Sequence, residues 1–129
     1  LQGRKFDAII DTSGFYPRHV RTSAELLRES GFYLFISTIS VYKDNDSPAD
    51  ETAPVGTVED TVSENQGAQG ERYGPLKALC EQEVQKVFVD RSAIVRPGFI
   101  VGPGDPTDRF TYWPVRAGEG GDFLCPGDG

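Results

Sequence analysis

Tyr73 and Lys77 are the two residues of this 129-residue chain whose types and spacing most clearly permit chemistry. They lie four positions apart where a helical pattern begins, so both side chains project from one face of a helix. An ammonium beside a phenol favours the phenolate and lowers the phenol's pKa, which is about 10 in model compounds. A tyrosine tuned in this way can exchange a proton with a substrate hydroxyl or carbonyl. The same spacing also suits two ordinary surface residues.

Ser37 and Thr38 place hydroxyl groups at the end of an apolar segment, Tyr33–Ser37. This segment is apolar on both faces, which predicts a central strand of a parallel sheet. Open α/β sheets bind ligands at the carboxyl ends of their strands. A hydroxyl at that edge can bond the same substrate oxygen that Tyr73 protonates. Alternatively, both hydroxyls satisfy backbone groups in a turn.

Another segment that is predicted to form a strand, Ser92–Arg96, stops at Pro97 and Gly98. A Pro-Gly pair at a strand end lets the backbone turn closely past a flat ligand. An ordinary turn between a strand and a loop explains the same residues equally well.

The elements that must position these residues alternate between strand and helix. We predict, in chain order, strand Phe6–Asp11, helix His19–Ser30 with Gly31 as its cap, strand Tyr33–Ser37, helix Gly74–Phe88, strand Ser92–Arg96, a weaker helix Thr107–Ala117 and the start of a strand at Phe123–Cys125. This order predicts an α/β fold with a parallel sheet and right-handed crossovers, in one domain over residues 1–129.

Residues 44–71 interrupt this alternation with a long acidic segment. It carries eight acidic residues and no Lys or Arg, and its prolines and glycines show no periodicity. We predict a long loop, because a segment of this kind inside a compact domain is usually a functional lid or a mobile stretch.

Charge and cysteine content exclude several classes of function. The net charge is −7, and the chain outside residues 44–71 is nearly neutral, which argues against nucleic acid and anionic membranes as partners. No apolar run approaches the roughly 18 residues that span a membrane. Cys80 and Cys125 fit no metal-ligand spacing and suit a reducing compartment. We therefore expect a cytoplasmic protein without a metal site.

Taken in order, these motifs resemble the extended short-chain dehydrogenase/reductase family, and within it the NAD-dependent epimerase/dehydratase group. The resemblance rests on Ser37–Tyr42, the acidic loop, Tyr-Gly-x-x-Lys at Tyr73–Lys77, and Arg-Pro-Gly-x-x-x-Gly-Pro at Arg96–Pro103. It covers about Phe6 to Gly127. It implies a three-layer Rossmann-like sheet, NAD or NADP as cofactor, a small-molecule substrate and a homo-oligomer.

The resemblance also assigns a role to each matching position. Tyr73 is similar to the family's catalytic acid/base, and Lys77 to the lysine that lowers its pKa and holds the nicotinamide ribose. Thr38, three residues before Val41, matches the catalytic hydroxyl, with Ser37 as second choice. The implied cofactor contacts are Thr12, Ser13 and Gly14 for the phosphate and ribose, and Pro97, Gly98 and Phe99 for the nicotinamide end.

One departure from the family pattern limits what the chain can do alone. The family's glycine-rich strand–turn–helix, which binds the pyrophosphate, is absent, so we interpret the chain as the centre of a larger enzyme, the second half of a dinucleotide-binding fold. The resemblance then implies hydride transfer on a hydroxyl or carbonyl substrate, with a nucleotide sugar as one candidate. A non-catalytic α/β module that dimerises or binds a protein partner is the alternative, since the missing half would leave a sheet edge and apolar faces exposed.

Overall fold

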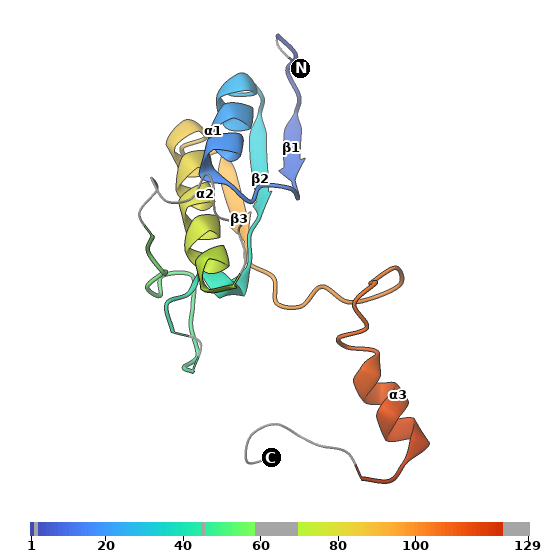
Figure 1. Cartoon of the computed structure of the whole chain (residues 1–129). Coiled ribbons are helices and arrows are strands. Elements are labelled where there is room, and N and C mark those ends of the chain that lie inside the picture. The colour runs from blue at the N-terminus through green and yellow to red at the C-terminus, as the bar shows by residue number, and fades with distance from the viewer. Residues whose placement is uncertain (2, 45, 59–69, 123–129) are drawn as a thin grey trace. The chain divides into compact units, whose positions relative to one another are not determined.

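The computed structural model describes residues 1, 3–44, 46–58 and 70–122. The chain divides into two compact units, Leu1–Gly98 and Phe99–Gly129. The first unit contains a small sheet and two long helices, and the second contains one short helix (Figure 1).

The sheet has three parallel strands, β1 (Ala8–Asp11), β2 (Phe32–Ile36) and β3 (Ser92–Val95), in the order β1-β2-β3. Helix α1 (Pro17–Leu26) connects β1 to β2, and helix α2 (Tyr73–Val87) lies between β2 and β3 in the chain. The predicted α/β class, the parallel pairing and the central place of the second strand are thereby confirmed.

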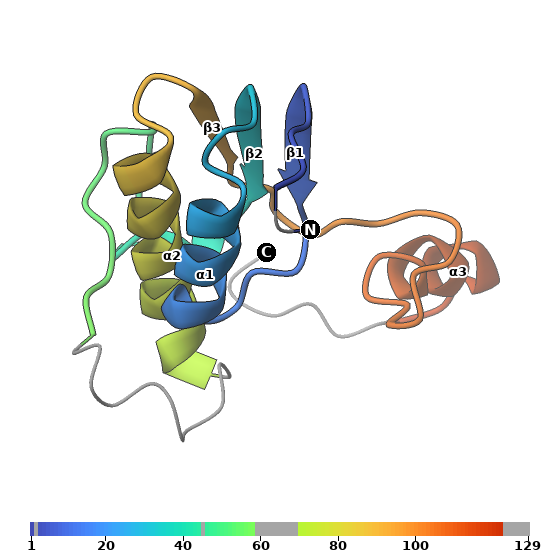
Figure 2. The ribbon, with the colours of Figure 1, turned by 90° about the horizontal axis from the view of Figure 1, so that it is seen from above.

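Both long helices lie side by side on one face of the sheet (Figure 2). The core forms between this face and the helices, and its centre is Phe35 on β2, which is fully buried. Around it pack Val20, Ala24, Tyr33, Cys80, Val84 and Phe88. Tyr33 and Phe88 stack with ring centroids 5.0 Å apart, a spacing at which aromatic pairs attract.

The opposite face of the sheet is apolar and bears no helix within the described part of residues 1–98. Strand alternation places Ile10, Leu34 and Ala93 there in one row across the three strands. Ile10 is 67% exposed and Val95, from a neighbouring row, is 42% exposed. The described part of residues 1–98 thus supplies two of the three layers that the resemblance implies.

Helix α1 ends earlier than its pattern predicts, at Leu26 rather than Ser30. The predicted role of Gly31 as its cap is therefore wrong. Gly31 instead donates its N–H to the carbonyl oxygen of Phe6 at 2.8 Å, and a Cβ at this position would overlap the carbonyl oxygen of Asp7. A close approach of two backbone segments explains this glycine.

Helix α2 begins and ends within one residue of its predicted bounds. The helical spacing of its apolar residues predicts a buried stripe of Leu76, Leu79, Cys80, Val84, Val87 and Phe88. Leu79 and Val87 are partly buried and the other four are buried. Lys77, Glu81 and Glu83 are buried as well. Buried charges require partners, and these partners come from elements distant in the sequence.

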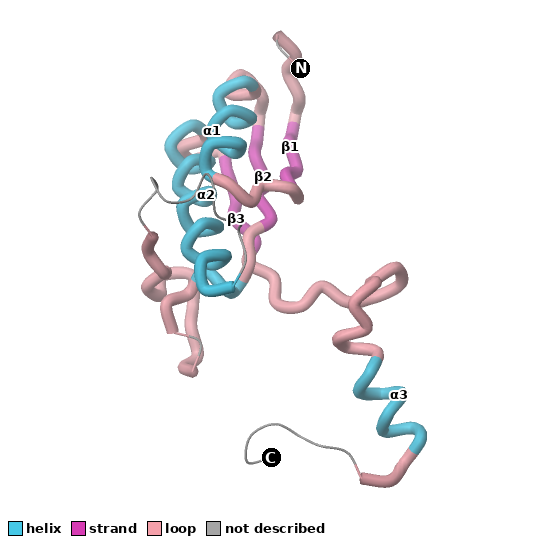
Figure 3. Tube along the Cα trace, in the orientation of Figure 1, coloured by secondary structure: helices cyan, strands magenta, loops and turns pink. Residues whose placement is uncertain are grey.

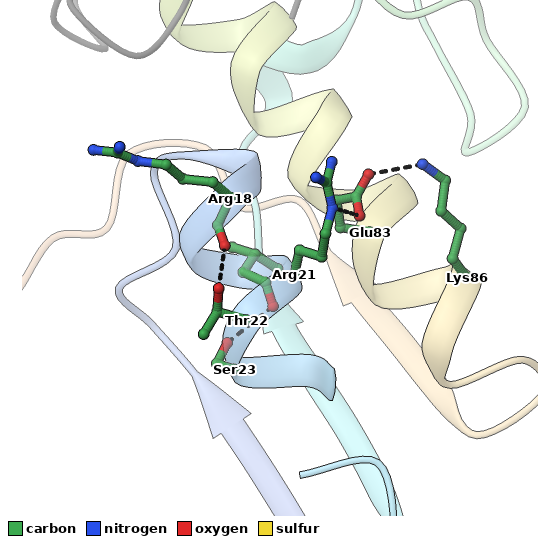
Figure 4. Close-up of polar contacts among 7 residues, drawn as sticks. Arg18, Arg21, Thr22, Ser23, Glu83 and Lys86 are labelled. Carbon is green, nitrogen blue, oxygen red and sulfur yellow. Dashed lines mark hydrogen bonds and ion pairs between the residues drawn. The ribbon is translucent and has the colours of Figure 1, made fainter. Parts of the chain in front are cut away.

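Glu83 forms ion pairs with two cations, Arg21 and Lys86, and the pair with Arg21 connects α2 to α1 (Figure 4). Arg21 of α1 donates its Nε–H to one carboxylate oxygen at 2.7 Å, and Lys86 donates to the other at 2.7 Å. The hydrogen bond from Arg21, with that from Lys86, lowers the pKa of the Glu83 carboxyl below its usual range.

We expect Glu83 to make folding pH-dependent on the acid side. Because its pKa is depressed in the folded state, its contribution to stability is complete above the unfolded value of 4.5 and is lost as the pH falls through the folded value. Glu83→Gln should lower the free energy of unfolding at neutral pH by about 1 kcal/mol and flatten this acid dependence.

Urea unfolding at a series of pH values measures both effects. Glu29→Gln is the matched control, because Glu29 is 66% exposed and lies 3.7 Å from an equally exposed Lys5. An acid dependence as steep in the Glu83 variant as in the wild type would contradict the assignment.

The chain after β2 turns through the 3₁₀ helix η1 (Ile39–Val41) and then folds back beside it. Tyr42 and Val55 form an antiparallel bridge, and Gly56 donates to the carbonyl oxygen of Val41 at 2.8 Å. The rest of residues 46–58 is irregular, as the loop prediction requires (Figure 3). Residues 59–69 of the predicted loop lie outside the described residues.

The second unit holds α3 (Tyr112–Glu119), which begins five residues later than the weaker helix predicted from the sequence. The residues before it form a turn in which Asp105 accepts hydrogen bonds from the backbone and hydroxyl of Thr107. The predicted strand at Phe123–Cys125 lies outside the described residues. No described helix combines the length and hydrophobicity needed to cross a membrane.

Candidate functional site

The three parallel strands end at the same edge of the sheet, and most of the candidate residues follow these ends directly. Ser37 donates its N–H to the carbonyl oxygen of Val95 at 2.7 Å, and Ile39 donates to the carbonyl oxygen of Pro97 at 3.1 Å. The structure therefore brings the hydroxyl segment after β2 beside the Pro-Gly turn after β3.

Lys77 reaches this edge from α2 and joins two of the strand ends. Its Nζ donates to the carbonyl oxygen of Gly14 at 2.7 Å and to that of Ile36 at 2.8 Å. The residue is only 3% exposed, and this burial lowers the pKa of its ammonium. Lys77 is thus a buried cation that ties the loop after β1 to the end of β2.

Two aromatic rings also contact the Lys77 ammonium. Nζ lies 4.1 Å from the ring centroid of Phe35 and 5.6 Å from that of Phe15. Both distances are within the range of cation–π attraction. The Phe15 ring also packs against Tyr73, with centroids 6.3 Å apart, so Phe15 contacts both members of the Tyr-Lys pair.

Tyr73 begins α2, and the first turn of the helix packs tightly on η1. A Cβ on Gly74 would overlap the carbonyl oxygen of Ser40. Only glycine permits this approach, which holds Tyr73 beside the segment that starts at Thr38.

The two candidate hydroxyls differ in their surroundings. Thr38 caps η1: its Oγ1 accepts from the backbone N–H of Ser40 and donates to the Ser40 hydroxyl, both at 3.2 Å. The turn alternative therefore describes Thr38 in this structure. Ser37 is 5% exposed, and among the described residues its Oγ is the buried side-chain polar atom that has no hydrogen-bond partner. An orphaned buried hydroxyl calls for an explanation, and a ligand is one.

Asp11 is a site residue that the sequence analysis did not single out. Its carboxylate accepts hydrogen bonds from the Tyr33 hydroxyl at 2.7 Å and from the Ser13 backbone at 2.9 Å. Burial raises the pKa of Tyr33, which keeps its hydroxyl a donor. Asp11 thereby fixes the loop that contains Thr12, Ser13 and Gly14. The Asp-Thr-Ser-Gly sequence, typical of an Asx turn, is the signal that could have revealed it.

Gly14 is the buried member of that loop, whereas Thr12 and Ser13 are exposed. A Cβ on Gly14 would lie 2.5 Å from side-chain atoms of Phe35 and Val20, so the loop passes directly over the core. Phe99, the remaining predicted cofactor contact, belongs to the second unit, where Arg109 lies over its ring at 4.7 Å.

A polar pocket of about 770 Å³ adjoins Tyr73. Its walls come from the first turn of α2, the end of η1 and the segment that folds back beside it. Polar groups reach it from Ser40, Tyr42, Lys43, Thr57, Glu71 and Tyr73. This mixture of hydroxyls, one cation and one anion suits a ligand with several hydroxyl or carbonyl groups.

Arg96, at the end of β3, pairs with Glu81 of α2 beneath this edge. Its Nε and Nη2 donate to the two carboxylate oxygens at 3.0 and 2.6 Å, and its Nη1 donates to the carbonyl oxygen of Glu51 at 3.3 Å. The hydrogen bonds to Glu81 raise the pKa of the Arg96 guanidinium above its usual value. This pair joins β3, α2 and the acidic segment.

Fold and site together define an α/β protein with a parallel sheet, whose candidate residues in the first unit gather at the carboxyl edge of that sheet. Comparisons of the chain with family models, curated proteins and solved structures found no match.

Proposed function

We propose that this chain is part of an NAD- or NADP-dependent epimerase, dehydratase or reductase of the extended short-chain dehydrogenase/reductase family, with the second half of a Rossmann-like fold. The substrate carries a hydroxyl or carbonyl group. The position of Lys77 carries the proposal: its ammonium is buried at the carboxyl ends of two parallel strands, one helical turn from Tyr73.

In this proposal each residue at the edge has a separate task. Tyr73 gives a proton to the reacting oxygen or takes one from it. Lys77 holds a hydroxyl of the ligand with the proton of its ammonium that is not donated to Gly14 or Ile36. Ser37, whose hydroxyl has no partner among the described residues, or Thr38 after it leaves Ser40, bonds the same substrate oxygen as Tyr73.

The residues present fit one end of a nicotinamide cofactor. A buried lysine, an orphaned serine hydroxyl and a Pro-Gly turn meet at one edge, and Gly98 leaves room beside Ile39. When bound, the cofactor supplies the hydride chemistry. The described residues include no glycine-rich turn between a strand and a helix that would hold the pyrophosphate, so the proposal assigns them the nicotinamide end and, through Thr12, Ser13 and Gly14, the phosphate and ribose that pass the loop after β1.

Calorimetric titration with NADH and NADPH tests the proposal directly. We expect micromolar binding of one of them if the site is completed within this chain or by a second copy. Lys77→Met should weaken that binding at least about a hundredfold, because it removes a charge-assisted hydrogen bond and frees two carbonyl groups that Lys77 holds. Lys86→Met, a change on the same helix at a 63% exposed side chain, is the control.

The outcomes separate three conclusions. Binding that depends on Lys77 and not on Lys86 supports the enzyme. Binding that survives Lys77→Met contradicts the proposed site. No binding at millimolar cofactor means that this chain does not act alone.

A non-catalytic α/β module that associates with a second copy is the second candidate. The apolar sheet face that bears no helix within the described part of residues 1–98 favours it, because parallel sheets are covered on both faces in stable proteins. Ile10 and Val95 on this face are mostly or partly exposed. Light scattering of a concentrated solution measures the association: a dimer that Ile10→Glu dissociates supports this candidate, and a monomer contradicts it.

A further inference from the structure

Phe15 has an unusual position for a large apolar side chain. It follows Gly14 in the loop after β1 and is 47% exposed, yet its ring lies over the buried ammonium of Lys77 and against the ring of Tyr73. The predicted site residues do not include it, and core packing does not require a half-exposed ring.

Four groups surround the Lys77 ammonium, and they differ in how freely they can move. Two are backbone carbonyl oxygens, of Gly14 and Ile36, and the third is the ring of Phe35, which is fully buried in the core. The fourth, Phe15, has half of its surface in solvent. Of these four groups, Phe15 is therefore the one whose side chain can move with the least disturbance of the sheet and α2.

Movement of Phe15 matters because the Lys77 ammonium has one proton left to donate. Lys77 has three, and within the described residues its hydrogen bonds to Gly14 and Ile36 use two. The third has no oxygen acceptor among the described residues, and the rings of Phe35 and Phe15 lie 4.1 and 5.6 Å from Nζ. Such rings attract a cation less strongly than an oxygen acceptor does. A hydroxyl that reaches this proton therefore replaces a weak contact by a stronger one.

We propose that Phe15 is a gate and positioning residue, which covers the Lys77 ammonium and turns aside when a ligand hydroxyl takes the third proton. The identity of that ligand as a nicotinamide cofactor rests on the proposed function; the gate itself does not. Because Phe15 also contacts Tyr73, the same movement opens the space beside the phenol.

Amine acylation of the whole chain tests the gate without any cofactor. The four lysines are Lys5, Lys43, Lys77 and Lys86, and acetic anhydride labels each at a rate that mass spectrometry of the peptides measures. We expect Lys77 to react at least about tenfold more slowly than Lys5 and Lys43, which are exposed. Phe15→Ala should raise the Lys77 rate about tenfold, and Phe15→Tyr, which keeps the ring, should leave it low.

A thiol on the same helix distinguishes an opened gate from an unpacked helix. Cys80 lies three residues after Lys77 and is fully buried, and burial raises its pKa to about 12. In a Cys125→Ser background, Cys80 should stay unreactive to iodoacetamide in Phe15→Ala if the gate alone has opened.

Three results would overturn the gate. Reaction of Lys77 as fast as that of Lys43 in the wild type shows that Phe15 does not cover the Lys77 ammonium. Continued protection of Lys77 in Phe15→Ala shows that other groups cover it. Joint exposure of Lys77 and Cys80 shows that Phe15 merely supports the packing of α2. A failure of NADH to bind, in contrast, bears only on the proposed function and leaves these rates unchanged.

Discussion

Arg96→Met is expected to lower the free energy of unfolding by about 3–5 kcal/mol, the usual loss when one partner of a buried ion pair is removed. The carboxylate of Glu81 is 5% exposed, and the Arg96 side chain is 18% exposed. Methionine keeps the apolar stem but leaves the carboxylate buried without its two hydrogen bonds. Urea unfolding followed by circular dichroism measures the loss.

Two further variants distinguish the destabilisation caused by one unpaired buried charge from the net contribution of the ion pair to the free energy of unfolding. Glu81→Leu combined with Arg96→Met removes both charges and should recover most of the lost stability, since no buried charge is left alone. Lys86→Met should change stability by less than about 1 kcal/mol, because its ion pair is exposed on the lysine side. A loss below about 1 kcal/mol in Arg96→Met would show that water reaches Glu81.

The Arg96 pair illustrates what the sequence could not reveal about α2. The apolar spacing of Leu76, Cys80 and Val84 predicts the buried stripe correctly, because periodicity is a local property of the chain. The burial of Glu81 and Glu83 depends on Arg96 and Arg21, which are 15 and 62 positions away. Nothing in the helix itself indicates that those cations will meet these carboxylates.

The candidate site likewise has features that the sequence predicts and contacts that only the structure reveals. The alternation of strands and helices was enough to predict a parallel sheet with Ser37 and Thr38 at the carboxyl end of its central strand. That this segment lies beside Pro97 comes from the structure. The hydrogen bond from Lys77 to Gly14 spans 63 positions, and the contact of Phe15 with the same ammonium follows from that loop. Distances of this kind follow from packing and not from spacing.

Glycines mark the places where sequence reasoning was most ambiguous. Gly31 fits a helix cap by its position, but the structure uses it for a backbone approach to Asp7. Gly74 lies inside the Tyr-Gly-x-x-Lys motif, where its packing against Ser40 gives the motif a physical reason. Both glycines allow a close approach of two backbone segments, which only the tertiary fold reveals.

Tyr73→Phe is expected to lower turnover by about a hundredfold to ten-thousandfold, the range for the loss of a positioned general acid or base. The substitution removes one hydroxyl and keeps the ring that packs against Phe15. We therefore expect the unfolding free energy and the affinity for the nicotinamide cofactor to stay the same. Turnover is followed by the absorbance of the reduced nicotinamide, in a form of the protein that is active.

Measuring both turnover and cofactor affinity in Tyr73→Phe distinguishes a catalytic role of Tyr73 from a structural one. A residue that merely supports the fold would lower stability and binding together, whereas a group that moves a proton affects the chemical step alone. Tyr112→Phe removes the same hydroxyl from an exposed tyrosine of the second unit and should leave turnover unchanged. If Tyr73→Phe retains full turnover, then Tyr73 is not the acid/base of this site, and the proposed chemistry must be abandoned.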